Sequence, residues 1–187
     1  MLNIAIVLGS TRQGRNGEAV ARWMYNFAVN RNDHVRYELV DLAAYPLPFF
    51  GEVVPAVMQQ RAAASVKAWS EKMAAFDGYI FVTPEYNHAT TGVLKNALDY
   101  LNAEVNNKAA GFVGYGGLGG ARAIENLRLI LGELQVADVR TAVTFSVITD
   151  FENMKRFNPA AHHAKNANEM LDQVLSWSRA LQSLRMG

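Results

Sequence analysis

Short apolar runs that alternate with helix-like stretches constrain the fold of this chain more than any other feature. Five runs predict strands, at residues 3–8, 35–41, 79–83, 111–115 and 141–147. The first, third and fourth are almost continuously apolar, which is typical of strands that are covered on both faces. This alternation predicts an α/β fold, a doubly wound parallel sheet of five strands.

Helical periodicity fills the segments between the predicted strands. Apolar residues recur at helical spacing within residues 18–29, 93–101, 124–134 and 170–181. A further connecting helix is expected over residues 62–76, with Val66, Trp69 and Met73 pointing inward. The chain has 187 residues and neither a linker nor an internal repeat, so we predict a single domain over residues 1–187.

Composition excludes several classes of function. The chain has no cysteine, which rules out disulfides, thiolate metal ligands and a cysteine nucleophile. Its net charge is +1 with both signs scattered, so no nucleic-acid-binding face is predicted. Apolar runs fall short of the roughly 18 residues that cross a bilayer, and the N-terminal residues have a strand pattern rather than that of a signal peptide. We therefore expect a cytoplasmic protein that binds neither nucleic acid nor membrane.

Ligands of doubly wound sheets bind beyond the carboxyl ends of the strands, where the strand order reverses. Three loops that leave predicted strands are therefore the segments in which to look for a site. They are the first loop (residues 9–17, GSTRQGRNG), the second loop (residues 83–92, TPEYNHATTG) and the third loop (residues 114–122, GYGGLGGAR).

The first loop predicts a site for one phosphate. Its glycines have the spacing of a nucleoside-triphosphate loop, but Arg15 and Asn16 stand where that loop needs lysine and a hydroxyl residue. Backbone N–H groups at a helix N-terminus still suit an anion, and Arg12 or Arg15 can add a charge-assisted contact. The alternative is a turn and a helix N-cap, with Asn16 or Ser10 as the cap and both arginines in solvent.

The third loop contains a literal G-x-G-x-x-G between a strand and a helix, which is the dinucleotide fingerprint. The acidic residue of that fingerprint should close the next strand. Asp138 instead precedes the strand expected at residues 141–147, and Asp150 comes much later. We therefore expect these glycines to let a flat ligand approach the backbone closely. A dinucleotide site and a plain glycine-rich turn remain the alternatives.

The second loop and the helix after it carry the most specific signal, PEYNHATTGVLKNALDYL. Together with GSTRQGRNGEAVARW, this segment closely resembles the NADPH-dependent FMN reductase family of flavodoxin-like proteins. GYGGLGGARAIENLRLIL is similar to the third flavin loop of the same family. The resemblance runs from residue 2 to residue 148 and implies a flavodoxin-like sheet in a three-layer α/β/α arrangement.

The resemblance implies that FMN binds across the three loops. The first loop would hold its phosphate, the second would line the isoalloxazine, largely through backbone and amide contacts, and the third would lie along the ring or the ribityl chain. The cofactor-binding residues predicted in this way are Ser10, Thr11, Arg12, Gln13, Gly14, Arg15, Asn16, Gly17, Pro84, Glu85, Tyr86, Asn87, Tyr115, Gly116 and Gly117.

The implied activity is that of an NAD(P)H oxidoreductase that passes hydride through FMN to a small-molecule acceptor: a quinone, a flavin, an azo compound or an oxyanion. Both NADPH and NADH stay open as co-substrates. The cofactor carries this chemistry, so no side chain is named as catalytic. One alternative is a flavodoxin-type electron carrier, against which the nearly balanced charge argues. Another is a dinucleotide-sensing regulator, against which the missing acidic residue argues.

The histidines give no support for a metal site. His88 follows the second-loop motif and is expected to make an edge contact rather than donate a proton. His162 and His163 are adjacent, so on a helix they are expected to point apart and not to form a metal pair.

Residues 44–58, AYPLPFFGEVVPAVM, predict an apolar loop, because three prolines block regular structure. Such a loop exposes Phe49 and Phe50 unless something covers them, and exposed apolar patches mark interfaces. The alternative is that the segment folds back over the core of its own domain. The resembling family favours dimers and often tetramers, so a homodimer or homotetramer is expected.

Overall fold

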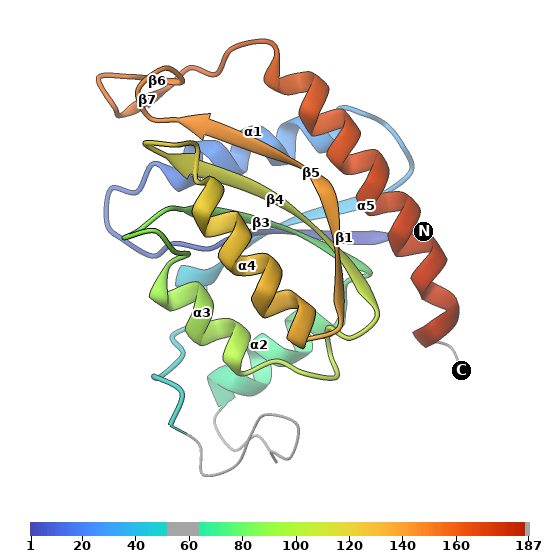
Figure 1. Cartoon of the computed structure of the whole chain (residues 1–187). Coiled ribbons are helices and arrows are strands. Elements are labelled where there is room, and N and C mark those ends of the chain that lie inside the picture. Colours follow the sequence, from blue (N-terminus) through green and yellow to red (C-terminus); the bar gives the residue numbers. More distant parts are fainter. Residues whose placement is uncertain (52–63, 186–187) are drawn as a thin grey trace.

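The computed structural model describes residues 1–51 and 64–185. Its main sheet has five strands, all parallel, in the order β2-β1-β3-β4-β5 (Figure 1). The strands are β1 (Asn3–Leu8), β2 (Arg36–Asp41), β3 (Gly78–Pro84), β4 (Lys108–Gly116) and β5 (Val136–Ser146). This strand order is that of the flavodoxin-like folds and reverses between β1 and β3. The predicted fold class is therefore confirmed.

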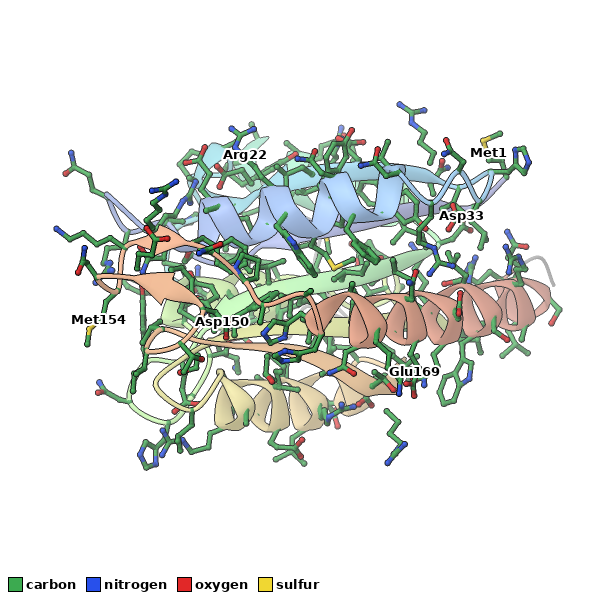
Figure 2. The ribbon with its side chains drawn as sticks, turned by 90° about the horizontal axis from the view of Figure 1, so that it is seen from above. Met1, Arg22, Asp33, Asp150, Met154 and Glu169 are labelled. Atoms are coloured by element: carbon green, nitrogen blue, oxygen red, sulfur yellow. The ribbon has the colours of Figure 1, made fainter. Side chains whose placement is uncertain are left out.

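Helices cover both faces of the sheet, and each face has its own apolar core. One face carries α1 (Gly17–Val29) and α5 (His163–Arg185), which lie side by side in Figure 2. The other carries α2 (Ala64–Ala74), α3 (Gly92–Asp99) and α4 (Ala121–Glu133). A 3₁₀ turn, η1 (Leu42–Ala44), follows β2. A small hairpin of β6 (Phe151–Glu152) and β7 (Arg156–Phe157) follows β5.

The apolar stripes of the sequence point into these two cores. Val66, Trp69 and Met73 of α2 are buried as predicted. Every residue of β3 is buried, because this strand has a neighbour on each side and helices on both faces. No helix among residues 1–51 and 64–185 is long and apolar enough to cross a membrane.

Two strands begin three or more residues earlier than their apolar runs predict. β4 starts at Lys108, whose ammonium is buried and donates to the carbonyl oxygens of Met73 (3.3 Å) and Ala74 (2.9 Å) at the end of α2. β5 starts at Val136, so Asp138 lies within the strand and the expectation that it precedes the strand is wrong. Arg128 of α4 forms an ion pair with Asp138, which offsets the charge of this carboxylate within the strand.

Only residues 44–51 of the apolar loop predicted at 44–58 lie within the described structure. Ala44 closes η1, and residues 45–51 have no regular structure. Phe50 packs against Tyr100 with ring centroids 5.1 Å apart, and its backbone N–H donates to Asn96 Oδ1 over 2.7 Å. Phe49 is 90% exposed. The loop thus folds back over its own core at Phe50 and leaves Phe49 on the surface.

Candidate active site

The three predicted loops meet at the carboxyl edge of the sheet. Strand register pairs Leu8 with Val82 and Pro84 with Tyr115, so the first, second and third loops leave the sheet side by side. Hydrogen bonds cross between them. The Gly9 N–H donates to Val82 O over 2.9 Å, and the Glu85 N–H donates to Tyr115 O over 3.1 Å.

Helix α3 is tied to the first loop at its start. Thr91 is the N-cap of α3 and accepts a hydrogen bond from Leu94 N at 3.0 Å. The hydroxyl of Thr91 also donates to Gly9 O over 2.5 Å. One threonine therefore caps the helix and fixes where the first loop departs from β1.

Most backbone N–H groups of the first loop make no hydrogen bond in the described structure. Among residues 1–51 and 64–185, the N–H groups of residues 11–17 find no hydrogen-bond acceptor. Asn16 is the N-cap residue of α1, but its side chain makes no capping bond and donates instead to Met154 O over 2.9 Å. The alternative of an N-cap by Asn16 is therefore wrong, and the N–H groups at the start of α1 stay available to an anion.

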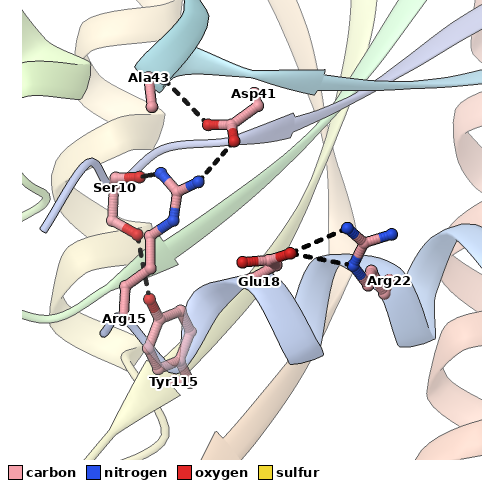
Figure 3. A network of polar contacts seen from close by, with 7 residues as sticks. All are labelled: Ser10, Arg15, Glu18, Arg22, Asp41, Ala43 and Tyr115. Atoms are coloured by element: carbon pink, nitrogen blue, oxygen red, sulfur yellow. Dashed lines mark hydrogen bonds and ion pairs between the residues drawn. The ribbon is translucent and has the colours of Figure 1, made fainter. Parts of the chain in front are cut away.

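The two arginines of the first loop have different surroundings. Arg12 is exposed and makes no ion pair or hydrogen bond within the described part of the chain. The Arg15 side chain is 11% exposed and bonds both Ser10 O and Asp41 (Figure 3). The alternative of two solvated arginines is thus wrong for Arg15.

Tyr115 of the third loop reaches the first loop. Its hydroxyl lies 3.4 Å from Ser10 Oγ, and both side chains are buried. Burial, opposed by the Ser10 contact, raises the pKa of Tyr115 to about 12, so the hydroxyl is protonated at neutral pH. A Cβ at Gly17 would lie 2.3 Å from Tyr115 Oη, so only glycine fits this position at the start of α1.

The second loop is a tight turn after β3. Tyr86 and Ala89 exchange backbone hydrogen bonds of 3.0 and 3.1 Å. Asn87 and His88, the two residues between them, have φ values of 49° and 69°. Two successive positive φ angles define a hairpin-type turn that asparagine tolerates well, as the sequence indicated. Tyr86 is 38% exposed and lies at the surface of the site.

The carboxylate of Glu85 joins the second loop to helix α4. Its side chain is 6% exposed and accepts hydrogen bonds from Arg122 N (3.1 Å) and Arg122 Nε (2.6 Å). Burial acts to raise the pKa of Glu85, but the hydrogen bonds and charge of Arg122 outweigh it and hold the pKa below its ordinary value. Sequence reasoning missed Arg122, although it stands in the third loop directly after the glycines. His88 Nε2 lies 2.8 Å from Arg122 Nη1.

Glycines give the third loop two different properties. Gly119 and Gly120 have φ values of 68° and 77°, and a Cβ at Gly120 would lie 2.6 Å from Tyr115 N. These two residues therefore make the sharp turn into α4. At Gly117 a Cβ would meet nothing within 4 Å, so the backbone there borders open space.

The adjacent histidines do not point apart. The rings of His162 and His163 lie 4.0 Å apart by their centroids, because α5 begins at His163 and helical geometry does not govern His162. His163 is buried and its Nε2 lies 2.8 Å from Asp150 Oδ1. No cluster of three or more histidine, aspartate or glutamate residues in the described structure could hold a metal ion.

Comparison with known proteins identifies the family. The sequence matches the family described as NADPH-dependent FMN reductase over residues 2–150. The chain belongs to this family. It is accordingly an FMN-dependent NAD(P)H oxidoreductase, as the sequence motifs predicted.

Individual relatives agree with this membership. The NAD(P)H-dependent FMN reductase ntnL of Nectria sp is 37% identical over 80% of this chain and 79% of its own. An FMN-dependent NADPH-azoreductase of Staphylococcus haemolyticus is 30% identical over 74% and 73%. An NAD(P)H:quinone oxidoreductase of Solanum tuberosum is 31% identical over 70% and 67%. In fold, the chain resembles the flavoenzyme FerB of Paracoccus denitrificans with a TM-score of 0.74 at 20% identity, covering 96% of this chain and 98% of that one.

The residues present fit an FMN phosphate. A phosphate monoester needs several N–H donors and one cation, and the first loop offers the free N–H groups of residues 11–17 with the guanidinium of Arg12. The open backbone at Gly117 leaves room beside the third loop for a flat group.

Proposed function

We propose that FMN lies across the carboxyl edge of the sheet, with its phosphate on the first loop and its ring between the second and third loops. The observation that carries this placement is the run of free N–H groups in residues 11–17, at the start of α1 and beside Arg12. Helix dipole, amide donors and guanidinium all favour a dianion there.

The remaining predicted residues would shape the pocket of the ring. Backbone groups of the turn at Tyr86–Ala89 would face its polar edge, and Tyr115 and the glycines after it would border the rest. The buried carboxylate of Glu85 is neutralised by Arg122, so it places no free negative charge beside the ring. When bound, FMN supplies the hydride and electron transfer between NAD(P)H and the acceptor. We assign no side chain as a catalytic acid or base.

We propose quinones and azo compounds as the acceptors of this enzyme. Support comes from the two relatives, 30% and 31% identical, whose names give an azoreductase and a quinone oxidoreductase. A steady-state screen of NADPH and NADH oxidation against a quinone, an azo dye, free flavin and chromate tests this proposal. Turnover with chromate alone would contradict it.

The same assay tests the order in which the nucleotide and the acceptor bind. We expect the nucleotide and the acceptor to alternate at one site, which gives parallel lines in double-reciprocal plots. Intersecting lines, which report a ternary complex, would contradict a shared site. A cytoplasmic location and assembly into a homodimer or homotetramer stay predictions.

A further inference from the structure

Arg15 is the feature of the first loop that the phosphate proposal does not use. Although the sequence places it beside the anion, its guanidinium turns inward, and its side chain is only 11% exposed. It donates to the carbonyl oxygen of Ser10 and, through Nη2, to Asp41 Oδ2 over 2.5 Å (Figure 3). Its charge is therefore opposed at close range by a carboxylate, which weakens its attraction for a phosphate.

Asp41 is itself held in place. It ends β2, the neighbour of β1 in the sheet, and pairs in register with Leu8. Its Oδ2 faces Arg15, while its Oδ1 accepts the N–H of Ala43 at 2.9 Å and so caps η1. Both carboxylate oxygens are thus engaged, and the anchor of Arg15 belongs to the rigid end of a strand.

Ser10 is fixed from two sides as a result. Arg15 holds its carbonyl oxygen, and Tyr115 Oη lies 3.4 Å from its hydroxyl. Gly9, just before it, is held by Val82 and by Thr91. The N–H groups of residues 11–17, which find no acceptor among the described residues, follow directly after this fixed segment.

From these contacts we infer that Arg15 and Asp41 are positioning residues: together they preset the first loop for the FMN phosphate, and neither touches it. This inference rests on the proposed placement of that phosphate. A loop that is ordered before binding loses less conformational freedom on binding and so binds more tightly. Arg12 is left as the cation that meets the phosphate.

The direction in which one substitution changes FMN affinity separates this positioning role from direct contact with the phosphate. If Arg15 bound the phosphate, Asp41→Asn would free it and remove a nearby negative charge, and FMN would bind more tightly. If the pair presets the loop, Asp41→Asn weakens FMN binding. We expect a loss of about tenfold, the size of one charge-assisted hydrogen bond. Arg15→Lys keeps the charge but not the two-pronged geometry, and we expect a similar loss.

Riboflavin, which lacks the phosphate, separates positioning from general damage to the fold. Apo-protein is titrated with FMN and with riboflavin, and quenching of flavin fluorescence gives each dissociation constant. Asp41→Asn and Arg15→Lys should lower FMN affinity and leave riboflavin affinity unchanged. Asp138→Asn breaks the Arg128–Asp138 pair between α4 and β5 and serves as the matched control, which should change neither constant.

The outcomes also separate this inference from the proposed function. Equal losses for the two flavins, an unchanged FMN affinity or a gain in FMN affinity in Asp41→Asn would each overturn the positioning role. If Arg12→Ala weakens FMN binding while Asp41→Asn does not, the phosphate site stands and only the positioning role fails. If wild-type protein does not prefer FMN over riboflavin, the phosphate site and the positioning role both fail.

Discussion

At the scale of single residues, Arg12 and Arg15 differ in their contacts with the rest of the chain. They are three positions apart on one loop, yet Arg15 is bonded to Asp41 and Arg12 has no partner in the described structure. We expect Arg12→Ala to weaken FMN binding by about 1.5–3 kcal/mol, the value of a hydrogen bond to a charged group. Fluorescence titration of the apo-protein measures the loss, with Arg140→Ala, an exposed arginine on β5, as the control. Unchanged affinity in Arg12→Ala would contradict the phosphate contact.

Gly17 is the second residue whose role depends on a neighbour far along the chain. Helix propensity alone predicts that alanine at the start of α1 stabilises by up to about 1 kcal/mol. Because its Cβ would lie 2.3 Å from Tyr115 Oη, we expect Gly17→Ala to destabilise the fold instead, by about 1–3 kcal/mol in urea denaturation. Gly132→Ala in α4, where a Cβ meets nothing within 4 Å, should stabilise. Adding Tyr115→Phe to Gly17→Ala removes the crowding hydroxyl and should recover part of the loss.

At the scale of elements, Glu85 links the second loop to the start of α4. We expect Glu85→Gln to destabilise by about 1–3 kcal/mol at pH 7, because the bond to the Arg122 guanidinium loses its charge. The pKa of Glu85 is held below its ordinary value of 4.5, so its contribution is complete above pH 4.5 and is lost as the pH falls through the lowered pKa. Urea denaturation between pH 7 and pH 3 should show a smaller acid loss in Glu85→Gln than in wild type. Equal acid losses would contradict this role.

The elements and the edge at which the site lies follow from the sequence, whereas the side-chain pairs do not. The apolar runs between segments of helical periodicity predicted the strands, because burial on both faces leaves a local signal in the sequence. Parallel strands end at the same edge of the sheet, which brings the three loops together. Asp41 and Arg122 were missed because their partners, Arg15 and Glu85, are 26 and 37 positions away. The start of β5 was missed because Asp138 interrupts its apolar pattern and Arg128, which offsets that charge, lies on another element.

At the scale of the whole molecule, one sheet supports two apolar cores. The same strands contribute side chains to both cores. Alternate residues of a strand point into the core under α1 and α5 and into the core under α2, α3 and α4. Loss of either core removes the support of the other, so we expect one cooperative unfolding transition for residues 1–187. Circular dichroism and tryptophan fluorescence should give coincident urea curves. Two separate transitions would contradict the prediction of a single domain.

The exposed surface around Phe49 predicts how the chain assembles. Phe49 is 90% exposed, and it borders a cavity of about 330 Å³ that is also lined by Tyr45, Leu47 and Val93. A large aromatic side chain beside a hollow with a mostly apolar lining suits a surface that a second copy of the chain covers. Sedimentation at micromolar concentration should therefore give a mass of at least twice the 20.6 kDa of one chain. Phe49→Asp should shift the protein toward monomer, whereas Leu129→Asp, at an exposed leucine of α4, should not. An active, flavin-loaded monomer in the wild type would contradict the prediction, and an unchanged mass in Phe49→Asp would place the interface elsewhere.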